Sequence, residues 1–148
     1  MKKNLHRIIM SALLTVLATV AASAQCYIVG SDNEWKTNTA AAELTETATT
    51  GVYEGDVTFV DGAQYFAVTQ HLTTGDADWT EFNKNRFAPS VFDAMLVINE
   101  PMTMVKGRDA SFKVPVAGTT YRMRIDFNTL TVTLLGDFPD KLYVWGSN

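Results

Sequence analysis

The sequence contains a single cysteine, Cys26, among its 148 residues. One cysteine can form neither an intramolecular disulfide nor a cysteine-based metal site, so the sequence excludes both. Histidine is almost as scarce, because His71 is the only one beyond the first 24 residues. A lone histidine with no nucleophile motif beside it argues against a catalytic triad. We therefore expect that the protein is not an enzyme.

Cofactor and metal motifs are also missing. The sequence has no glycine-rich phosphate loop, so a nucleotide cofactor has no support. Asp76-Ala77-Asp78 begins like a calcium loop, but Glu81 and Phe87 stand where that motif needs glycine and glutamate. Acidic residues in the same segment could supply a carboxylate pair for glycoside hydrolysis, yet such enzymes usually need a larger fold to hold a cleft. We expect no cofactor, no metal and no hydrolase activity.

A long hydrophobic run occurs only at the N-terminus. Residues 1–7 carry three basic side chains, and residues 8–20 are almost wholly apolar. Ala22-Ser23-Ala24 then places small side chains at the two positions that a signal peptidase reads. A membrane-spanning helix needs about 20 apolar residues, so a cleaved signal peptide is favoured over an anchor. The sequence predicts an exported protein with a signal peptide at 1–24.

Cys26 lies two residues after the expected cleavage site. A lipid-acceptor cysteine normally follows Gly, Ala or Ser, whereas Gln25 precedes this one. We therefore expect no lipid anchor at Cys26. The thiol is instead expected to be free or buried and to behave as a small hydrophobic group at the start of a strand.

Acidic residues predominate once the signal peptide is removed. Nine Lys and Arg then remain against sixteen Asp and Glu, which gives a formal charge of −7. This balance argues against nucleic acid or an anionic lipid surface as the partner. The remaining 124 residues are enough for one ordinary hydrophobic core, so we expect one domain.

Alternation of apolar and polar residues dominates the mature chain. Residues 121–127 alternate in this way, and a second alternating run follows at 130–134, so the pair predicts a β-hairpin. Seven or eight short strands separated by turns predict an all-β fold, an Ig-like antiparallel β-sandwich at 25–138. The further strands are expected at 26–29, 52–59, 63–70, 102–105 and 110–114.

Two polar segments, 31–50 and 71–97, do not follow this alternation. Within the first, residues 40–44 are expected to form a brief helical turn. Long loops are uncommon in a compact domain unless they have a function. These two segments, each of which contains a tryptophan, are therefore where we expect a site.

The aromatic and polar side chains of these segments suit a sugar. Pyranose rings have apolar C–H faces that stack on tryptophan, and hydroxyls that need polar partners. Either tryptophan could instead cover the end of the core, a role favoured for Trp35, and Arg86 could simply pair with Asp78 or Glu81. The candidate ligand-binding residues are Trp79, Glu81, Asn83, Lys84, Asn85 and Arg86, with Trp35 and Lys36 as a second, smaller set.

The C-terminal residues repeat the start of the mature chain. Residues 142–148 follow the outline of residues 26–33, and Tyr143 lies 116 residues after Tyr27, about the length of one sandwich domain. We expect residues 139–148 to be the first strand of a following repeat in a truncated chain. The alternative is coincidence, because short Val- and Tyr-rich strands followed by Gly are common.

Several stretches of the chain resemble a known family. They are Tyr27-Ile28-Val29-Gly30-Ser31 before a Trp-containing loop, Tyr65-Phe66-Ala67-Val68, the block at 78–89 and the closing hairpin at 121–133. Together they are similar to the tandem β-sandwich modules of SusE/SusF-like outer-membrane proteins of Bacteroidetes. Gln25 before Cys26 departs from the lipid anchor that is usual in that family.

The resemblance implies non-catalytic binding of starch or a related α-glucan, with aromatic side chains stacking on sugar rings beside Lys, Arg and Asn. It also implies a place in an outer-membrane glycan-uptake complex. The expected location is the cell envelope, with the outer-membrane surface favoured over the periplasm or secretion. The alternative function is a structural spacer or adhesin-like repeat with no glycan site.

Overall fold

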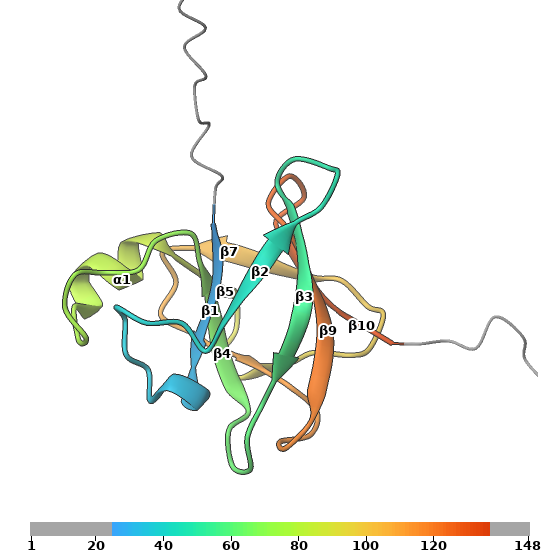
Figure 1. Ribbon diagram of the computed structural model, residues 1–148, viewed down its shortest axis with the longest axis horizontal. Helices are drawn as coiled ribbons and strands as arrows, with labels where there is room; N and C mark the ends of the chain where they lie inside the picture. Colours follow the sequence, from blue (N-terminus) through green and yellow to red (C-terminus); the bar gives the residue numbers. More distant parts are fainter. Residues whose placement is uncertain (1–24, 137–148) are drawn as a thin grey trace, which may run out of the picture.

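A computed structural model describes residues 25–136 of the protein (Figure 1). The expected signal peptide at 1–24 and the expected repeat strand at 139–148 lie outside these residues. The described part contains ten strands and two short helices. In chain order they are β1 (Cys26–Gly30), η1 (Ser31–Asn33), β2 (Ala42–Glu46), β3 (Val52–Thr58), β4 (Tyr65–Thr69), α1 (Trp79–Asn85), β5 (Arg86–Pro89), β6 (Ala94–Met95), β7 (Met102–Lys106), β8 (Phe112–Lys113), β9 (Thr120–Asp126) and β10 (Thr131–Leu135).

The strands form one sheet that closes on itself. Around the ring the order is β1-β2-β3-β9-β10-β7-β5-β4, and β4 pairs again with β1. Every pairing in this ring is antiparallel. The short strand β8 pairs with β4 beside β5, and β6 runs parallel to β8. The predicted all-β class is therefore confirmed, but the sheet is a closed barrel.

The expected sandwich of two separate sheets is not observed because two strands connect the halves. β2 pairs with both β1 and β3, and β7 pairs with both β5 and β10. Hydrogen bonds therefore continue around the whole ring, and closure leaves the ring without a free edge. β2 begins within residues 40–44, which were expected to form a helical turn, so the sequence pattern did not indicate this connecting strand.

The predicted hairpin at 121–134 is confirmed. Val132 lies opposite Ile125 and Leu134 opposite Met123, and all four side chains are buried in the barrel core. Thr131 and Thr133 alternate with them and are partly exposed. One face of the hairpin is in the core and the other is in water, which is the arrangement that produces alternation in a sequence.

Two local predictions were wrong. Residues 40–44 contribute to the strand β2, where Leu44 lies opposite Cys26 and its side chain is buried. The segment 71–97, expected to be a loop, contains the helix α1 and the strand β5. Asp78 caps α1, because its Oδ1 accepts a hydrogen bond from the backbone N–H of Glu81 at 3.1 Å.

Helix α1 packs on the outside of the barrel against β1 and β4 (Figure 1). Phe82 of the helix, Val29 of β1 and Ala67 of β4 form a small buried cluster, with Trp35 and Leu72 packed against it. We call this the outer cluster. It explains why β1 and β4 are apolar on both faces, since their inner faces are in the barrel core and their outer faces lie under α1.

Neither helix among residues 25–136 has the length and apolar character needed to cross a membrane.

Closure between β1 and β4 requires a glycine at position 30. A Cβ atom at Gly30 would collide with Tyr65 O and would lie 2.8 Å from Phe66 Cα, both backbone atoms of β4. We expect Gly30→Ala to lower the free energy of unfolding by about 1–3 kcal/mol, the usual cost of overpacking. Gly75→Ala is the control, because nothing lies within 4 Å of a Cβ there. Equal urea midpoints for the two variants would contradict this close approach.

The buried thiol of Cys26 makes alkaline stability pH-dependent. Burial, reinforced by the negative charge of Glu43, raises the pKa of Cys26 to about 12, whereas an unperturbed thiol ionises near pH 9. The folded state therefore keeps a proton that the unfolded state loses, and stability falls as the pH rises from 9 to 12. We expect urea unfolding of the wild type to lose up to about 1.4 kcal/mol per pH unit more than Cys26→Ala in this window. If the wild type and Cys26→Ala lost stability equally with rising pH, folding would not protect the thiol from ionisation.

Candidate functional site

A buried threonine joins the loop after η1 to the segment that precedes α1. Thr37 is fully buried, and its backbone N–H donates to Asp76 O at 2.9 Å. Its hydroxyl donates to Gly75 O at 2.9 Å and accepts from the backbone N–H of Asp78 at 3.1 Å. Because Asp78 caps α1, these bonds place the loop that carries Trp35 beside the start of the helix.

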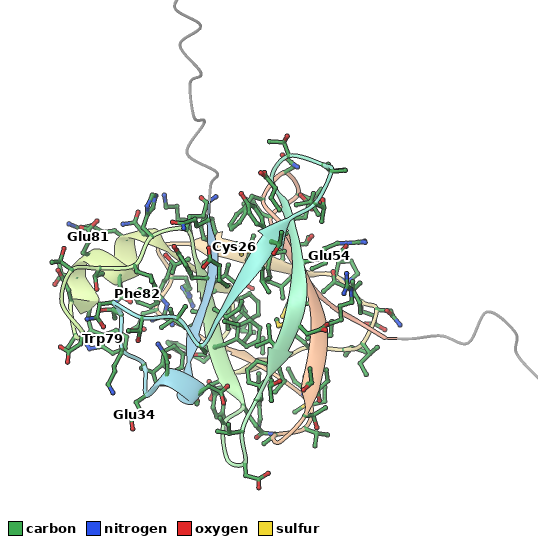
Figure 2. The ribbon with its side chains drawn as sticks, viewed as in Figure 1. Cys26, Glu34, Glu54, Trp79, Glu81 and Phe82 are labelled. Carbon is green, nitrogen blue, oxygen red and sulfur yellow. The ribbon has the colours of Figure 1, made fainter. Side chains whose placement is uncertain are left out.

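The two tryptophans predicted for the site are therefore neighbours. The ring centroids of Trp35 and Trp79 are 6.5 Å apart, with the planes tilted by 46°. Trp79 also packs edge-on against Phe82, whose side chain is fully buried in the outer cluster. Trp79 itself is 40% exposed and Trp35 is partly buried. A buried phenylalanine thus supports an exposed tryptophan at the first residue of α1 (Figure 2).

Arg86 lies at the junction of α1 and β5 and is only 3% exposed. Its Nη1 donates to Asn83 Oδ1 at 3.0 Å and to Asp109 Oδ1 at 2.9 Å, and its Nη2 donates to the carbonyl of Ala110. The guanidinium also lies 5.8 Å from the ring centroid of Trp35 and 5.6 Å from that of Phe82. Burial lowers the pKa of Arg86, and the charge of Asp109 opposes that shift. Neither partner that the sequence suggested for this arginine, Asp78 or Glu81, is the one observed.

These side chains border an open cleft of about 290 Å³ on the outside of the barrel. It is lined by Trp35, Trp79, Arg86, Asp109 and Ser111. The first two residues provide aromatic faces, and Asp109 and Ser111 add a carboxylate and a hydroxyl. Arg86 Nε is buried and has no hydrogen-bond partner within residues 25–136. The cleft therefore combines apolar ring surface with several hydrogen-bonding groups.

The structure separates the eight predicted site residues into two groups. Trp35, Trp79 and Arg86 line the cleft, and Asn83 contributes indirectly because it orients Arg86. The other four lie elsewhere, and each is engaged with a neighbour. Glu81 and Asn85 border a different hollow, where Asn85 Nδ2 donates to Glu81 Oε1 at 2.8 Å. Lys84 forms an ion pair with Glu81 at 3.5 Å. Lys36 forms an ion pair with Glu34 at 2.8 Å.

Asp109 and Ser111 were missed by the sequence analysis. They follow Gly107 in the turn between β7 and β8, a short segment that contains no tryptophan. The turn reaches the cleft because the backbone N–H of Gly107 donates to Arg86 O at 2.8 Å. The only local signal was the Gly107-Arg108-Asp109 turn itself, which does not indicate where the turn packs.

Two other possibilities for a site are less convincing. A larger hollow of about 390 Å³ lies near β5 and β7, but Glu100 is the only charged residue among those that line it. Ser90 and Thr103 also border it, but none of its lining residues is aromatic, so it has no ring surface beside its polar groups. Residues 25–136 also contain no group of three or more His, Cys, Asp or Glu residues that could hold a metal ion.

Arg86 is expected to be a structural support of the cleft. Arg86→Ala would remove the partner of the Ala110 carbonyl and leave a void between Trp35 and Phe82, so we expect the free energy of unfolding to fall by about 2–4 kcal/mol. Lys84→Ala is the matched control, because Lys84 is an exposed basic residue whose ion pair contributes at most about 1 kcal/mol. Chemical denaturation of both variants tests the difference. Equal stability would mean that Arg86 does not hold the site.

Comparisons with protein-family models, with curated proteins and with solved structures found no match to this chain. The chemistry of the cleft is therefore the basis for interpreting its function.

Proposed function

We propose that the protein binds carbohydrate chains at the tryptophan cleft and does not act on them chemically. The observation that carries this proposal is the partly exposed pair of Trp35 and Trp79 beside Asp109 and Ser111. An α-glucan such as starch is the favoured ligand, and the envelope of the exporting cell is the favoured location. Both choices rest on the resemblance to SusE/SusF-like modules.

The exposure of Trp79 supports binding over a purely structural role. A tryptophan that only closed the core would be buried, as Phe82 is, whereas Trp79 leaves 40% of its surface in water. An exposed ring next to polar groups is typical of a surface that stacks on a ligand. The spacer alternative would be favoured if both tryptophans were buried, and neither is.

The polar groups of the cleft complement the ring surface. Stacking one face of a pyranose on Trp79 brings its hydroxyls towards the border of the cleft, where Asp109 accepts and Ser111 both donates and accepts hydrogen bonds. These features together favour a ligand rich in hydroxyls over a purely apolar one.

The tilt between the tryptophans favours a curved chain. Two ring planes that are tilted by 46° to each other suit stacking on a bent sugar chain better than on a flat one. An α-linked glucan curves along its length, whereas a β-1,4-linked chain is flat. This geometry agrees with the preference for α-glucans that the resemblance implies.

Affinity electrophoresis of the chain through gels containing different glycans tests the proposal. We expect starch to retard the wild type, and we expect Trp79→Ala to migrate as in a glycan-free gel because the stacking surface is lost. Phe92→Ala is the control: Phe92 is an aromatic residue that is 69% exposed and does not line the cleft. Circular dichroism confirms that both variants are folded. If no glycan retards the wild type, the spacer function is favoured instead.

A further inference from the structure

Asp109 is the most exposed charged group of the cleft, and only half of its carboxylate is in use. Its side chain is 80% exposed, and its Oδ1 accepts the hydrogen bond from Arg86. Within residues 25–136 this side chain has no second partner, so Oδ2 is left to accept hydrogen bonds from outside the protein. A carboxylate oxygen is acceptor-only when ionised, and it suits the hydroxyl of a neutral molecule.

The position of this carboxylate is well defined despite its exposure. Arg86 holds the turn that carries Asp109 through three groups: its carbonyl accepts from the N–H of Gly107, its Nη1 donates to Asp109 and its Nη2 donates to the carbonyl of Ala110. Ala110 is itself 2% exposed. A buried arginine therefore fixes the turn on both sides of Asp109, which makes the carboxylate a directed acceptor rather than a mobile surface charge.

The accessible charge of the cleft is negative. The positive charge of Arg86 is buried and is paired with Asp109, whose own oxygen atoms face the solvent. Lys36, the nearest basic residue in sequence to Trp35, is paired with Glu34 at 2.8 Å. Arg108, which is exposed beside Asp109, places its guanidinium 5.8 Å from the ring centroid of Phe92, a residue that does not line the cleft. The mature chain is also acidic overall. An anionic ligand would therefore meet repulsion both from the cleft and from the whole protein.

We infer that Asp109 determines which glycans the cleft accepts. Its free oxygen accepts hydrogen bonds from the hydroxyls of a neutral sugar, and its charge excludes glycans that carry carboxylate or sulfate groups. This inference rests on the proposed carbohydrate binding and adds a selectivity residue to it.

A neutral polymer and a carboxymethylated one, in which some hydroxyls carry a carboxylate group, test this selectivity, and the salt dependence of their binding isolates the effect of charge. Isothermal titration calorimetry is carried out with amylopectin and with carboxymethylated amylopectin. We expect the wild type to bind the neutral polymer at least about tenfold more tightly, a difference of about 1.4 kcal/mol. High salt should narrow this preference, because charge repulsion at an exposed site is screened.

Two substitutions at position 109 distinguish charge from hydrogen bonding. Asp109→Asn keeps an oxygen for Arg86 and removes the charge, so it should bind the carboxymethylated polymer more tightly and reduce the preference to less than threefold. Asp109→Ala removes the acceptor as well and should weaken binding of amylopectin about tenfold. Asp56→Asn, which removes one exposed carboxylate on β3 of the far half of the barrel, should keep the wild-type preference.

The outcomes separate this inference from the proposed function. If the wild type binds both polymers equally well, or if Asp109→Asn leaves the preference unchanged, Asp109 does not set selectivity although the cleft still binds glycans. If the wild type binds neither polymer, both the inference and the α-glucan assignment are wrong. Thermal melting of every variant shows that the changes arise from the cleft and not from unfolding.

Discussion

Strand β1 has to be covered on both of its faces, and the rest of the structure depends on how this is done. Ile28 enters the barrel core and Val29 enters the outer cluster, while the backbone of β1 pairs with β2 on one side and with β4 on the other. A strand that is apolar on both faces is stable only if both are shielded from water. The barrel shields the inner face, and Phe82 of α1 shields the outer one. The helix that covers β1 is also the helix that begins with Trp79.

Arg86 connects this covering layer to the proposed binding cleft. A buried guanidinium loses its hydration, so it is tolerated only where hydrogen-bond acceptors replace water. The acceptors come from Asn83 on the helix and from Asp109 and Ala110 on the turn after β7. The hydrogen bonds that satisfy the buried charge of Arg86 therefore place the turn after β7 next to the two tryptophans. The same interaction supports the fold and positions a polar group of the cleft.

How much of the fold could be predicted depended on how each segment is buried. The hairpin was predictable because one face is in the core and the other is in water, so that Val132 alternates with Thr131 and Thr133. The strand β2 was not predictable, because only Leu44 among its residues is buried and, of the Ala, Glu and Thr residues around it, only Thr favours strands. α1 was missed for a similar reason, since a helix with one buried residue has no hydrophobic period to detect.

The sequence by itself determined which segments alternate and which loops carry aromatic and polar side chains, because both depend on residue type and local spacing. Only the tertiary structure decided that the sheet closes through β1 and β4, and that Trp35 meets Trp79 while Glu81 and Lys84 lie elsewhere. It also brought in Asp109, which no local pattern had marked. These features depend on hydrogen bonds and burial between segments far apart in the chain. Contacts of this kind do not produce a regular spacing of apolar residues that could be recognised in the sequence.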